Sequence, residues 1–341
     1  MSRTLLAAAL IAGGVASSSL VLTGPAQAEE AVCPLERTIV QAGLGWESAD
    51  FHAEVVSLVL EHGFGCTVDK VPVETLPALQ GLARGDLDIM MEVWVANAEE
   101  PWLAGLEAGT VTDLGVNFPD APQGWFVPRY LVEGPDAPAP DLRTVADLAR
   151  YTELFADPEE PTRGRFYNCV TGWGCEQTNT RKLTAYGLDE LYTNFRPGSG
   201  GAFSAEILSR VARQRPIVFY YWAPSGVFGK IGDDIVMLEE PEYDAEIWAE
   251  LQSSDNPTRA VAYPNAPVHI GGNTEFVEAA PAIADFLRAY ETTTAETSAA
   301  IAYMEDNDAE ARDAAAHFLS TTTAWEGWLP AEVAARVRAA L

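Results

Sequence analysis

The sequence predicts an α/β protein built from two blocks of strands and helices. Its 341 residues are enough for two domains of ordinary size. Hydrophobic residues make up 48% of the chain and charged residues 21%, and this composition favours a sizeable core over global disorder. Between residues 37 and 94 strand and helix patterns alternate, which is typical of a parallel sheet. A second series of strands runs from Trp125 to Trp222.

The first block begins with a buried strand at Arg37–Gly45 that ends in glycine. The next segment, Ser48–His62, has apolar residues at helical spacing and is followed by Gly63, a common C-cap residue. The pattern continues with strand Thr67–Glu74, helix Leu76–Arg84 and strand Asp86–Trp94. In open α/β sheets the ligand binds at the carboxyl ends of such strands, so we expect the functional residues there.

The second block follows the Pro-containing stretch Asn117–Gln123. Its predicted elements are strand Gly124–Val132, helix Val145–Phe155, strand Arg165–Thr171, helices Glu176–Tyr186 and Ala202–Arg213, and the buried strand Pro216–Trp222. Short strands at Asp234–Leu238 and Val268–Gly271 and an Ala-rich helical region from Glu278 onward complete the chain. Since both ends of the chain have α/β or helical character, we expect residues 29–120 and 224–341 to form one lobe and residues 121–223 the other.

The N-terminus has the features of a secretory signal peptide. Arg3 precedes an apolar stretch at Leu5–Ala16, and Ala26-Gln27-Ala28 forms an A-x-A cleavage site. The apolar run is too short to span a membrane. We therefore expect cleavage after Ala28, which removes residues 1–28 and leaves a free periplasmic protein.

The chain is strongly acidic, with 21 Lys and Arg residues, 50 Asp and Glu residues and a formal net charge of −29. Such a charge repels nucleic acid and anionic membrane surfaces, and we exclude both as partners. The same charge favours encounter with small cations, although it also fits a surface that stays soluble in salty surroundings.

Four cysteines follow the predicted cleavage site: Cys33, Cys66, Cys169 and Cys175. An even number in an exported chain favours two disulfides, for which three connectivities exist. We favour the local pairs, Cys169 with Cys175 around a short loop and Cys33 with Cys66 near the starts of two predicted strands. The cysteine spacings and the scattered histidines do not fit a zinc site, so we expect no metal.

Nine tryptophans are many for this length, and five lie at the end or start of a predicted strand, beside glycine or a turn. These five are Trp46, Trp94, Trp125, Trp173 and Trp222. Burial in a core is the usual explanation for a single tryptophan. An aromatic cluster in one cleft, however, is also how proteins hold a quaternary ammonium, which lacks N–H donors and is attracted to the faces of aromatic rings.

The loop Gly172-Trp173-Gly174-Cys175 adds a candidate anion site. Its glycines allow close approach of the backbone, and the helix that follows presents free N–H groups and the positive end of its dipole. A cation cage beside such a loop fits a zwitterion such as a betaine. A disulfide-closed loop that binds no ligand explains the same residues equally well.

Further motifs accompany this loop. In chain order they are Gly45-Trp46-Glu47-Ser48-Ala49, Gly85-Asp86-Leu87-Asp88-Ile89 with Glu92-Val93-Trp94, Gln123-Gly124-Trp125, Gly172-Trp173-Gly174-Cys175-Glu176 and Tyr220-Tyr221-Trp222-Ala223-Pro224. Through this ordered set the chain resembles the substrate-binding components of quaternary-amine ABC transporters, the glycine betaine/proline betaine/choline-binding family. The resemblance extends over most of residues 36–271. The GWGCE segment is especially similar to the enteric-type betaine-binding proteins, in which a disulfide closes that loop.

The resemblance implies a two-lobed periplasmic binding protein of type II, which closes around a ligand in the interlobe cleft and delivers it to a membrane permease. Trp94, Trp173 and Trp222 match the three cage tryptophans of the enteric-type members. The backbone N–H groups of Gly174 and Cys175 match the donors to the ligand's carboxylate. We therefore expect a monomeric transport protein with no cofactor and no enzymatic activity.

Trp46 and Trp125 match aromatic positions that choline-binding relatives use. The chain departs from the enteric pattern at Glu92, which shares a face of its predicted strand with Trp94. A carboxylate near the cage would favour a cation, including one without a carboxylate of its own. The expected ligand is therefore one of glycine betaine, choline, trimethylamine N-oxide or a sulfonium analogue.

The alternative to a binding protein is an exported, glycosidase-like hydrolase. Glu47, Asp50 and Glu92 would supply its paired carboxylates, with tryptophans as sugar platforms. However, Glu47 and Asp50 lie in the first turn of a predicted helix, where acids are common, and the sequence has no G-x-S-x-G serine motif. We therefore favour the capture of a small quaternary amine for transport, with osmoprotection as its use.

Overall fold

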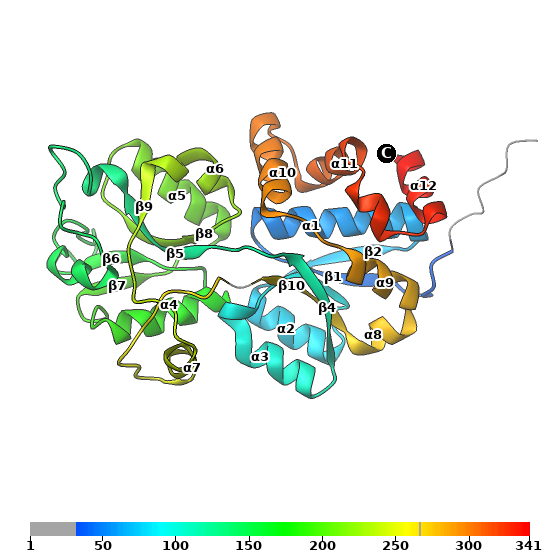
Figure 1. Ribbon diagram of the computed structural model, residues 1–341, viewed down its shortest axis with the longest axis horizontal. Helices are drawn as coiled ribbons and strands as arrows, with labels where there is room; N and C mark the ends of the chain where they lie inside the picture. The colour runs from blue at the N-terminus through cyan, green and yellow to red at the C-terminus, as the bar shows by residue number, and fades with distance from the viewer. Residues whose placement is uncertain (1–31, 266) are drawn as a thin grey trace, which may run out of the picture. The chain divides into compact units, whose positions relative to one another are not determined.

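The computed structural model describes residues 32–265 and 267–341 (Figure 1). The predicted signal peptide, residues 1–28, lies outside the described residues. Two five-stranded sheets, each with helices packed against it, make up the described part of the chain. The α/β class that the sequence predicts is confirmed.

The first sheet has the strand order β2-β1-β3-β10-β4. Its strands are β1 (Ile39–Gly43), β2 (Val68–Pro72), β3 (Ile89–Trp94), β4 (Val111–Phe118) and β10 (Val268–Asn273). As predicted, β1 runs parallel to β2, with Gln41 opposite Lys70, and parallel to β3. β10 is antiparallel to both β3 and β4, with Val268 opposite Trp94. Because β10 follows the second block in sequence, it brings the chain back to the first sheet.

Helices cover both faces of the first sheet. They are α1 (Glu47–Leu58), which continues in a π-helical turn at Val59–Gly63, α2 (Thr75–Arg84), α3 (Val95–Glu107), α8 (Thr274–Ala279), α9 (Pro281–Ala289), α10 (Thr294–Asn307), α11 (Ala311–Thr321) and α12 (Ala331–Ala340). α1 and the C-terminal helices α9–α12 share a core with one face, and α2 and α3 share a core with the other (Figure 1). Ile89 and Met91 of β3 enter the first core, whereas Met90 and Val93 enter the second. Burial on both faces explains the continuous apolar run of this strand.

The second sheet has the order β7-β6-β8-β5-β9. Its strands are β5 (Gln123–Pro128), β6 (Gly164–Tyr167), β7 (Tyr192–Phe195), β8 (Val218–Trp222) and β9 (Ile235–Met237), and its helices are α4 (Gly174–Ala185), α5 (Gly200–Ala212), α6 (Gly226–Ile231) and α7 (Ala245–Ser253). β6 is parallel to β7 and β8, whereas β5 is antiparallel to β8 and β9. Adjacent residues of β5 face opposite layers, because Trp125 packs near Tyr186 beside α4 and Phe126 packs on Phe228 of α6.

The position of β9 differs from the predicted lobe boundary. β9 pairs with β5, with Val236 opposite Val127, and Trp248 and Tyr263 belong to the core of the second sheet. The strand at residues 235–237 therefore lies in the second sheet and not with the remainder of 224–341, to which we assigned it. A three-residue apolar strand carries no pattern that reveals which sheet it joins.

Two helix predictions also differ from the structure. The segment Val145–Phe155 forms only a 3₁₀ segment at Val145–Arg150, which begins with a capping box of Thr144 and Asp147. Conversely, α3 is a helix that the sequence analysis does not predict. Pro101 lies inside α3 and Ala98 has non-helical backbone angles, so the helical pattern is interrupted.

Both favoured disulfides are confirmed. Cys33–Cys66 joins the segment before β1 to the segment before β2, and Cys169–Cys175 joins the segment after β6 to the first turn of α4. Among the described helices, none combines the length and the apolar character that a membrane span requires.

Candidate ligand-binding site

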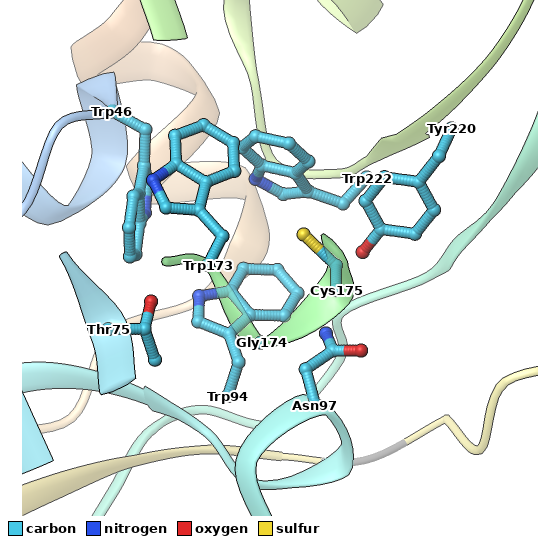
Figure 2. Close-up of a pocket in the computed structure, with 9 residues that line it drawn as sticks. All are labelled: Trp46, Thr75, Trp94, Asn97, Trp173, Gly174, Cys175, Tyr220 and Trp222. Atoms are coloured by element: carbon cyan, nitrogen blue, oxygen red, sulfur yellow. The ribbon is translucent and has the colours of Figure 1, made fainter. Parts of the chain in front are cut away.

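A cavity lined by four tryptophans lies where loops from the two sheets meet. About 310 Å³ of space between atoms, part of it open to solvent, lies within this cavity. Its wall consists of Trp46, Thr75, Trp94, Asn97, Trp173, Gly174, Cys175, Tyr220 and Trp222 (Figure 2). A wall of this composition suits a small ligand with a large apolar part.

Each tryptophan of the wall stands where a strand ends or a helix begins. Trp94 is the last residue of β3 and Trp222 is the last residue of β8. Trp46 immediately precedes α1, which follows β1, and Trp173 immediately precedes α4, which follows β6. β1 is parallel to β3, and β6 is parallel to β8. The cavity therefore lies at the carboxyl ends of these strands in both sheets, as the rule for open α/β sheets predicts.

The indole rings stand nearly perpendicular to one another. The ring centroid of Trp173 lies 5.3 Å from those of both Trp46 and Trp222, at interplanar angles of 72° and 79°. The centroids of Trp94 and Trp222 are 6.2 Å apart, at an angle of 74°. Edge-to-face packing of this kind leaves ring faces turned toward a common space (Figure 2). The negative faces of aromatic rings attract cations.

Carboxylates outside the cavity accept the N–H groups of three of these indoles. Glu92 Oε2 accepts from Trp46 Nε1 at 2.7 Å and from Trp94 Nε1 at 2.8 Å. Glu74 accepts from Trp173 Nε1. These contacts hold the three rings by their N–H edges from outside the wall.

The first turn of α4 supplies the polar part of the wall. Gly174 and Cys175 are the first two residues of α4, so their N–H groups have no acceptor within the helix and lie at the positive end of its dipole. A Cβ on Gly174 would collide with the backbone oxygen of Asn97, which explains a glycine here. The Cys169–Cys175 disulfide ties this turn to the segment after β6. The backbone donors are therefore held in place before a ligand arrives.

Six of the eight predicted ligand-binding residues line the cavity, namely Trp46, Trp94, Trp173, Trp222, Gly174 and Cys175. Trp125 does not. Its ring is fully buried, packs on Phe166 at a tilt of 33° with the centroids 4.0 Å apart, and donates from Nε1 to Asn179 of α4 at 2.6 Å. β5 begins at the edge where β8 ends, with Gln123 opposite Trp222, and Trp125 lies two residues further into the sheet, opposite Tyr220. The assignment of Trp125 to the ligand is corrected: it packs in the core.

Glu92 also lies outside the wall, behind Trp46 and Trp94. Its side chain is 0% exposed. Burial raises the pKa of its carboxyl to about 7, although the hydrogen bonds from the two indoles act in the opposite direction. His52 Nε2 lies 3.9 Å from Glu92 Oε1, and burial lowers the pKa of this imidazole to about 3. His52 is therefore neutral at neutral pH and gives Glu92 no positive partner.

Three residues of the wall are absent from the sequence prediction: Thr75, Asn97 and Tyr220. Tyr220 lies two residues before Trp222 on β8, and strand alternation places both side chains on one face. This signal was available in the sequence. Asn97, which donates to Gln123 Oε1 at 2.8 Å, lies in the helix that the sequence does not predict. Thr75 begins α2, and no sequence signal distinguishes it from other helix starts.

None of the described residues that line the cavity has a charged side chain. Glu47 accepts from the Gly226 N–H at 3.2 Å and Asp50 pairs with Lys70; both acids lie outside the wall. The paired carboxylates that a glycosidase needs are therefore not assembled around this cavity. Within residues 32–265 and 267–341, no group of three or more His, Cys, Asp or Glu side chains could hold a metal ion.

Comparison with known proteins agrees with this geometry. The model of the family described as the substrate binding domain of ABC-type glycine betaine transport system matches residues 37–321. The glycine betaine/proline betaine-binding periplasmic protein of Escherichia coli (strain K12) is 26% identical over 306 residues, which are 88% of this chain and 86% of that protein. The trimethylamine N-oxide-binding protein of Pelagibacter ubique (strain HTCC1062) is 22% identical over 286 residues, which are 84% of this chain and 88% of that protein.

The fold has solved counterparts. The crystal structure of the glycine betaine, L-proline ABC transporter binding protein (ProX) from Borrelia burgdorferi has a TM-score of 0.71 at 18% identity, and the alignment covers 88% of this chain and 100% of that one. This likeness shows the two-lobed fold of a periplasmic binding protein. The family consists of transporter components that bind substrates, and the hydrolase alternative finds no support in it. Because the family model spans most of the sequence, this chain belongs to the family of substrate-binding domains of ABC-type glycine betaine transport systems.

Proposed function

We propose that this chain captures a small quaternary ammonium or betaine-type solute in the tryptophan-lined cavity and delivers it to the permease of an ABC transporter. The observation that carries this proposal is a wall of four indoles without a charged side chain among its described residues. A trimethylammonium group has a positive charge but no N–H donor, so aromatic faces are suited to hold it, each with about 0.5–2 kcal/mol. The names of the relatives, which bind glycine betaine, proline betaine or trimethylamine N-oxide, support the same ligand class.

In this proposal the two ends of the ligand meet different parts of the wall. Trp46, Trp94, Trp173 and Trp222 surround the cationic end. The N–H groups at the start of α4 donate to a carboxylate or an N-oxide oxygen. Since the described wall has no cationic side chain, an anionic end is held by neutral donors and the helix dipole alone. A cation without a carboxylate, such as choline, therefore also fits.

The proposal includes export to the periplasm with cleavage after Ala28 and action as a monomer. Two disulfides support an oxidising compartment, and the Escherichia coli relative is a periplasmic protein. The net charge of −29 argues against a nucleic-acid partner.

We also propose that each sheet belongs to its own lobe and that the lobes rotate about the two segments in which the chain passes from one lobe to the other. The first crossing joins Phe118 of β4 to Gln123 of β5, and the second leads from Tyr263 to Val268 of β10. Asn265 Nδ2 donates to Asp120 Oδ1 at 3.3 Å, so the two crossings are adjacent. In this division the lobes follow the predicted boundaries, except that β9 and the residues up to Tyr263 join the second lobe. Rotation about such a hinge would open the cavity.

Calorimetric titration of residues 29–341 tests the proposed function. The ligands are glycine betaine, proline betaine, choline, trimethylamine N-oxide, dimethylsulfoniopropionate, carnitine and proline. We expect saturable binding of at least one quaternary ammonium, sulfonium or N-oxide compound. Failure of all of them to bind would overturn the proposal, and turnover of glycosides or esters would favour the hydrolase alternative.

A further inference from the structure

Glu92 is a buried carboxylate that contacts two of the tryptophans in the cavity wall, Trp46 and Trp94. It lies on β3 two residues before Trp94, and its Oε2 accepts the N–H groups of Trp46 and Trp94 at 2.7 and 2.8 Å. Trp46 comes from the loop after β1 and Trp94 from the end of β3. One oxygen atom therefore fixes the positions of two rings from different elements.

The other oxygen of Glu92 has no close partner in the described part of the chain, although the nearby Ser48 hydroxyl acts to lower the pKa of the carboxyl. Oε1 has no hydrogen-bond partner among the described residues. The basic group within 4.0 Å of it in this part of the chain is His52 Nε2, at 3.9 Å. His52 Nδ1 shares a hydrogen bond of 2.8 Å with the Tyr290 hydroxyl, and its Nε2 lies 3.3 Å from the Thr297 hydroxyl. Both ring nitrogens of His52 thus face neutral hydroxyls.

The elements around Glu92 supply no positive charge in the described structure. α1 contributes His52, whose pKa burial lowers to about 3. The segment after α9 contributes Tyr290, whose pKa burial raises well above its usual value, so its hydroxyl stays neutral. α10 carries Glu296, which is engaged at the N-cap with Thr293. Glu92 is therefore a buried acid without a cationic partner, and such a group is costly to keep ionised.

Resting on the proposed function above, we propose that Glu92 is the positioning and specificity-determining residue of the cage: it holds Trp46 and Trp94, and its negative charge finds its counter-charge in the cation of the ligand. The ligand then completes an ion pair across the two indoles. An indole whose N–H is bonded to an anion is also polarised toward a more negative ring face, which strengthens its attraction for a cation. The site would thus select positive charge as well as shape.

An uncharged isostere of the ligand distinguishes the effect of the ligand's charge on affinity from the effect of its shape. Choline is a permanent cation, and 3,3-dimethylbutan-1-ol is its uncharged carbon isostere. The variant Glu92→Gln keeps the size of the side chain and an oxygen acceptor but removes the charge. We expect this variant to bind choline about tenfold more weakly or worse at pH 8, and to change the affinity for the isostere by less than about twofold. Equal losses for both ligands would mean that Glu92 acts through packing alone and would overturn the proposed selectivity.

The pH dependence of ligand binding by the wild-type protein is a second test of the role of Glu92. Burial raises the pKa of Glu92 to about 7, and a bound cation stabilises its ionised form. The affinity for choline should therefore fall as pH decreases from 8.5 to 6, and Glu92→Gln should abolish this dependence. Glu74→Gln is the matched control, because Glu74 also accepts an indole N–H, from Trp173, but is only half-buried. That variant should keep the wild-type pH profile.

The outcomes distinguish this inference from the proposed function. Wild-type protein that binds no quaternary amine at any pH would overturn the proposed function. Wild-type protein that binds choline with equal affinity from pH 6 to 8.5, or a Glu92→Gln variant with the wild-type profile, would overturn the role of Glu92 and leave the proposed function standing. Circular dichroism of each variant establishes that its fold is retained.

Discussion

At the residue scale, burial does not separate the tryptophans that line the cavity from core tryptophans. Trp125 is 0% exposed and Trp173 is 3% exposed, yet only Trp173 lines the cavity. Their N–H partners differ more clearly. Trp173 donates to the carboxylate of Glu74, whereas Trp125 donates to the amide oxygen of Asn179 within its own lobe. Trp46 and Trp94 donate to a carboxylate as Trp173 does, whereas Trp222 Nε1 has no partner among the described residues.

We predict that Trp94→Ala, Trp173→Ala and Trp222→Ala each weaken binding of a quaternary amine by about tenfold or more. Each indole face contributes roughly 1–2 kcal/mol to a desolvated cation, and about 1.4 kcal/mol corresponds to tenfold in affinity. Because these rings lie between the lobes, the folding of each lobe should change less than binding does. Calorimetric titration and thermal melting of each variant provide the two measurements.

Trp125→Ala and Trp248→Ala are the controls, since both rings are buried in the core of the second sheet. They should lower the free energy of unfolding by roughly 3–5 kcal/mol and leave the affinity of the folded protein unchanged. If the cage variants behaved like these controls, the assignment of Trp94, Trp173 and Trp222 to the ligand would be wrong.

The charge of Glu92 also predicts how stability depends on pH. Burial raises its pKa from 4.5 to about 7 in the folded chain, so the folded chain keeps a proton that the unfolded chain releases between these values. Stability of the ligand-free protein should therefore fall as pH rises through this window, by on the order of 3 kcal/mol. The Glu92→Gln variant has no carboxyl to ionise at this position, so its stability should not fall in this window. It should therefore be more stable than the wild type at pH 8. Urea denaturation of both proteins at pH 5 and pH 8 measures the difference, and an identical pH dependence would contradict it.

The positions of some of these residues could be predicted from the sequence, whereas the positions of others depend on contacts that the sequence pattern does not show. Trp94 and Trp222 end strands that are parallel to a neighbour, so the rule for open sheets places them correctly. Trp125 has a similar sequence context, but it is the third residue of β5 and lies opposite Tyr220, whereas Gln123 lies opposite Trp222 at the edge of the sheet; this register is a property of the sheet rather than of the local pattern. The position of Glu92 behind the rings depends on its contact with Trp46, 46 residues away in sequence.

At the element scale, the start of α4 contacts the opposite lobe. Gly174 lies against the backbone oxygen of Asn97, which belongs to α3 of the first lobe. Leu76 N–H of α2 donates to Gly172 O of the same loop at 3.1 Å. The loop before α4 is therefore both a part of the wall and a contact between lobes. The sequence of the loop predicts the helix and the disulfide. It does not predict the contact with α3, because Pro101 inside α3 interrupts the helical pattern of that segment.

We predict that Gly174→Ala weakens binding of every ligand by about tenfold or more without destabilising the free protein. Gly174 is the first residue of α4, and alanine is a good helix former, so α4 itself should lose no stability. The added Cβ would collide with Asn97 O only when the lobes meet, and it should therefore oppose closure. Titration with glycine betaine and choline, together with thermal melting of the free protein, tests both parts.

Gly201→Ala is the matched control, since Gly201 also lies in the first turn of a helix, α5, and a Cβ there meets no atom within 4 Å. This control should bind like the wild type. A Gly174→Ala variant with wild-type affinity would show that the lobes do not approach at this point.

At the scale of the whole binding unit, two further polar contacts join the lobes, in addition to Trp173 Nε1 with Glu74 and Leu76 N–H with Gly172 O. The carboxylate of Glu47 in α1 accepts from the Gly226 N–H at 3.2 Å, and Glu305 of α10 pairs with Lys230 of α6 at 3.0 Å. Both acids thus reach the same short helix of the second lobe. Partly exposed ion pairs are weak, at about 0–1 kcal/mol, so the pair of Glu305 and Lys230 alone should not keep the lobes closed. A bound ligand that bridges both lobes would supply the remaining free energy, and closure would then report occupancy to a permease.

We predict that saturating ligand compacts the wild-type protein in small-angle X-ray scattering and that Glu305→Gln raises the ligand concentration needed for half-maximal compaction. The variant loses the Lys230 ion pair, whose side chains are 19% and 48% exposed, so the shift should be no more than about fivefold. Glu133→Gln is the control, because Glu133 forms a comparable exposed ion pair with Arg129 within the second lobe. It should leave the compaction midpoint unchanged. An equal shift in both variants would indicate a general effect of net charge, and the absence of compaction in wild-type protein that binds ligand would rule out lobe closure as the signal to the permease.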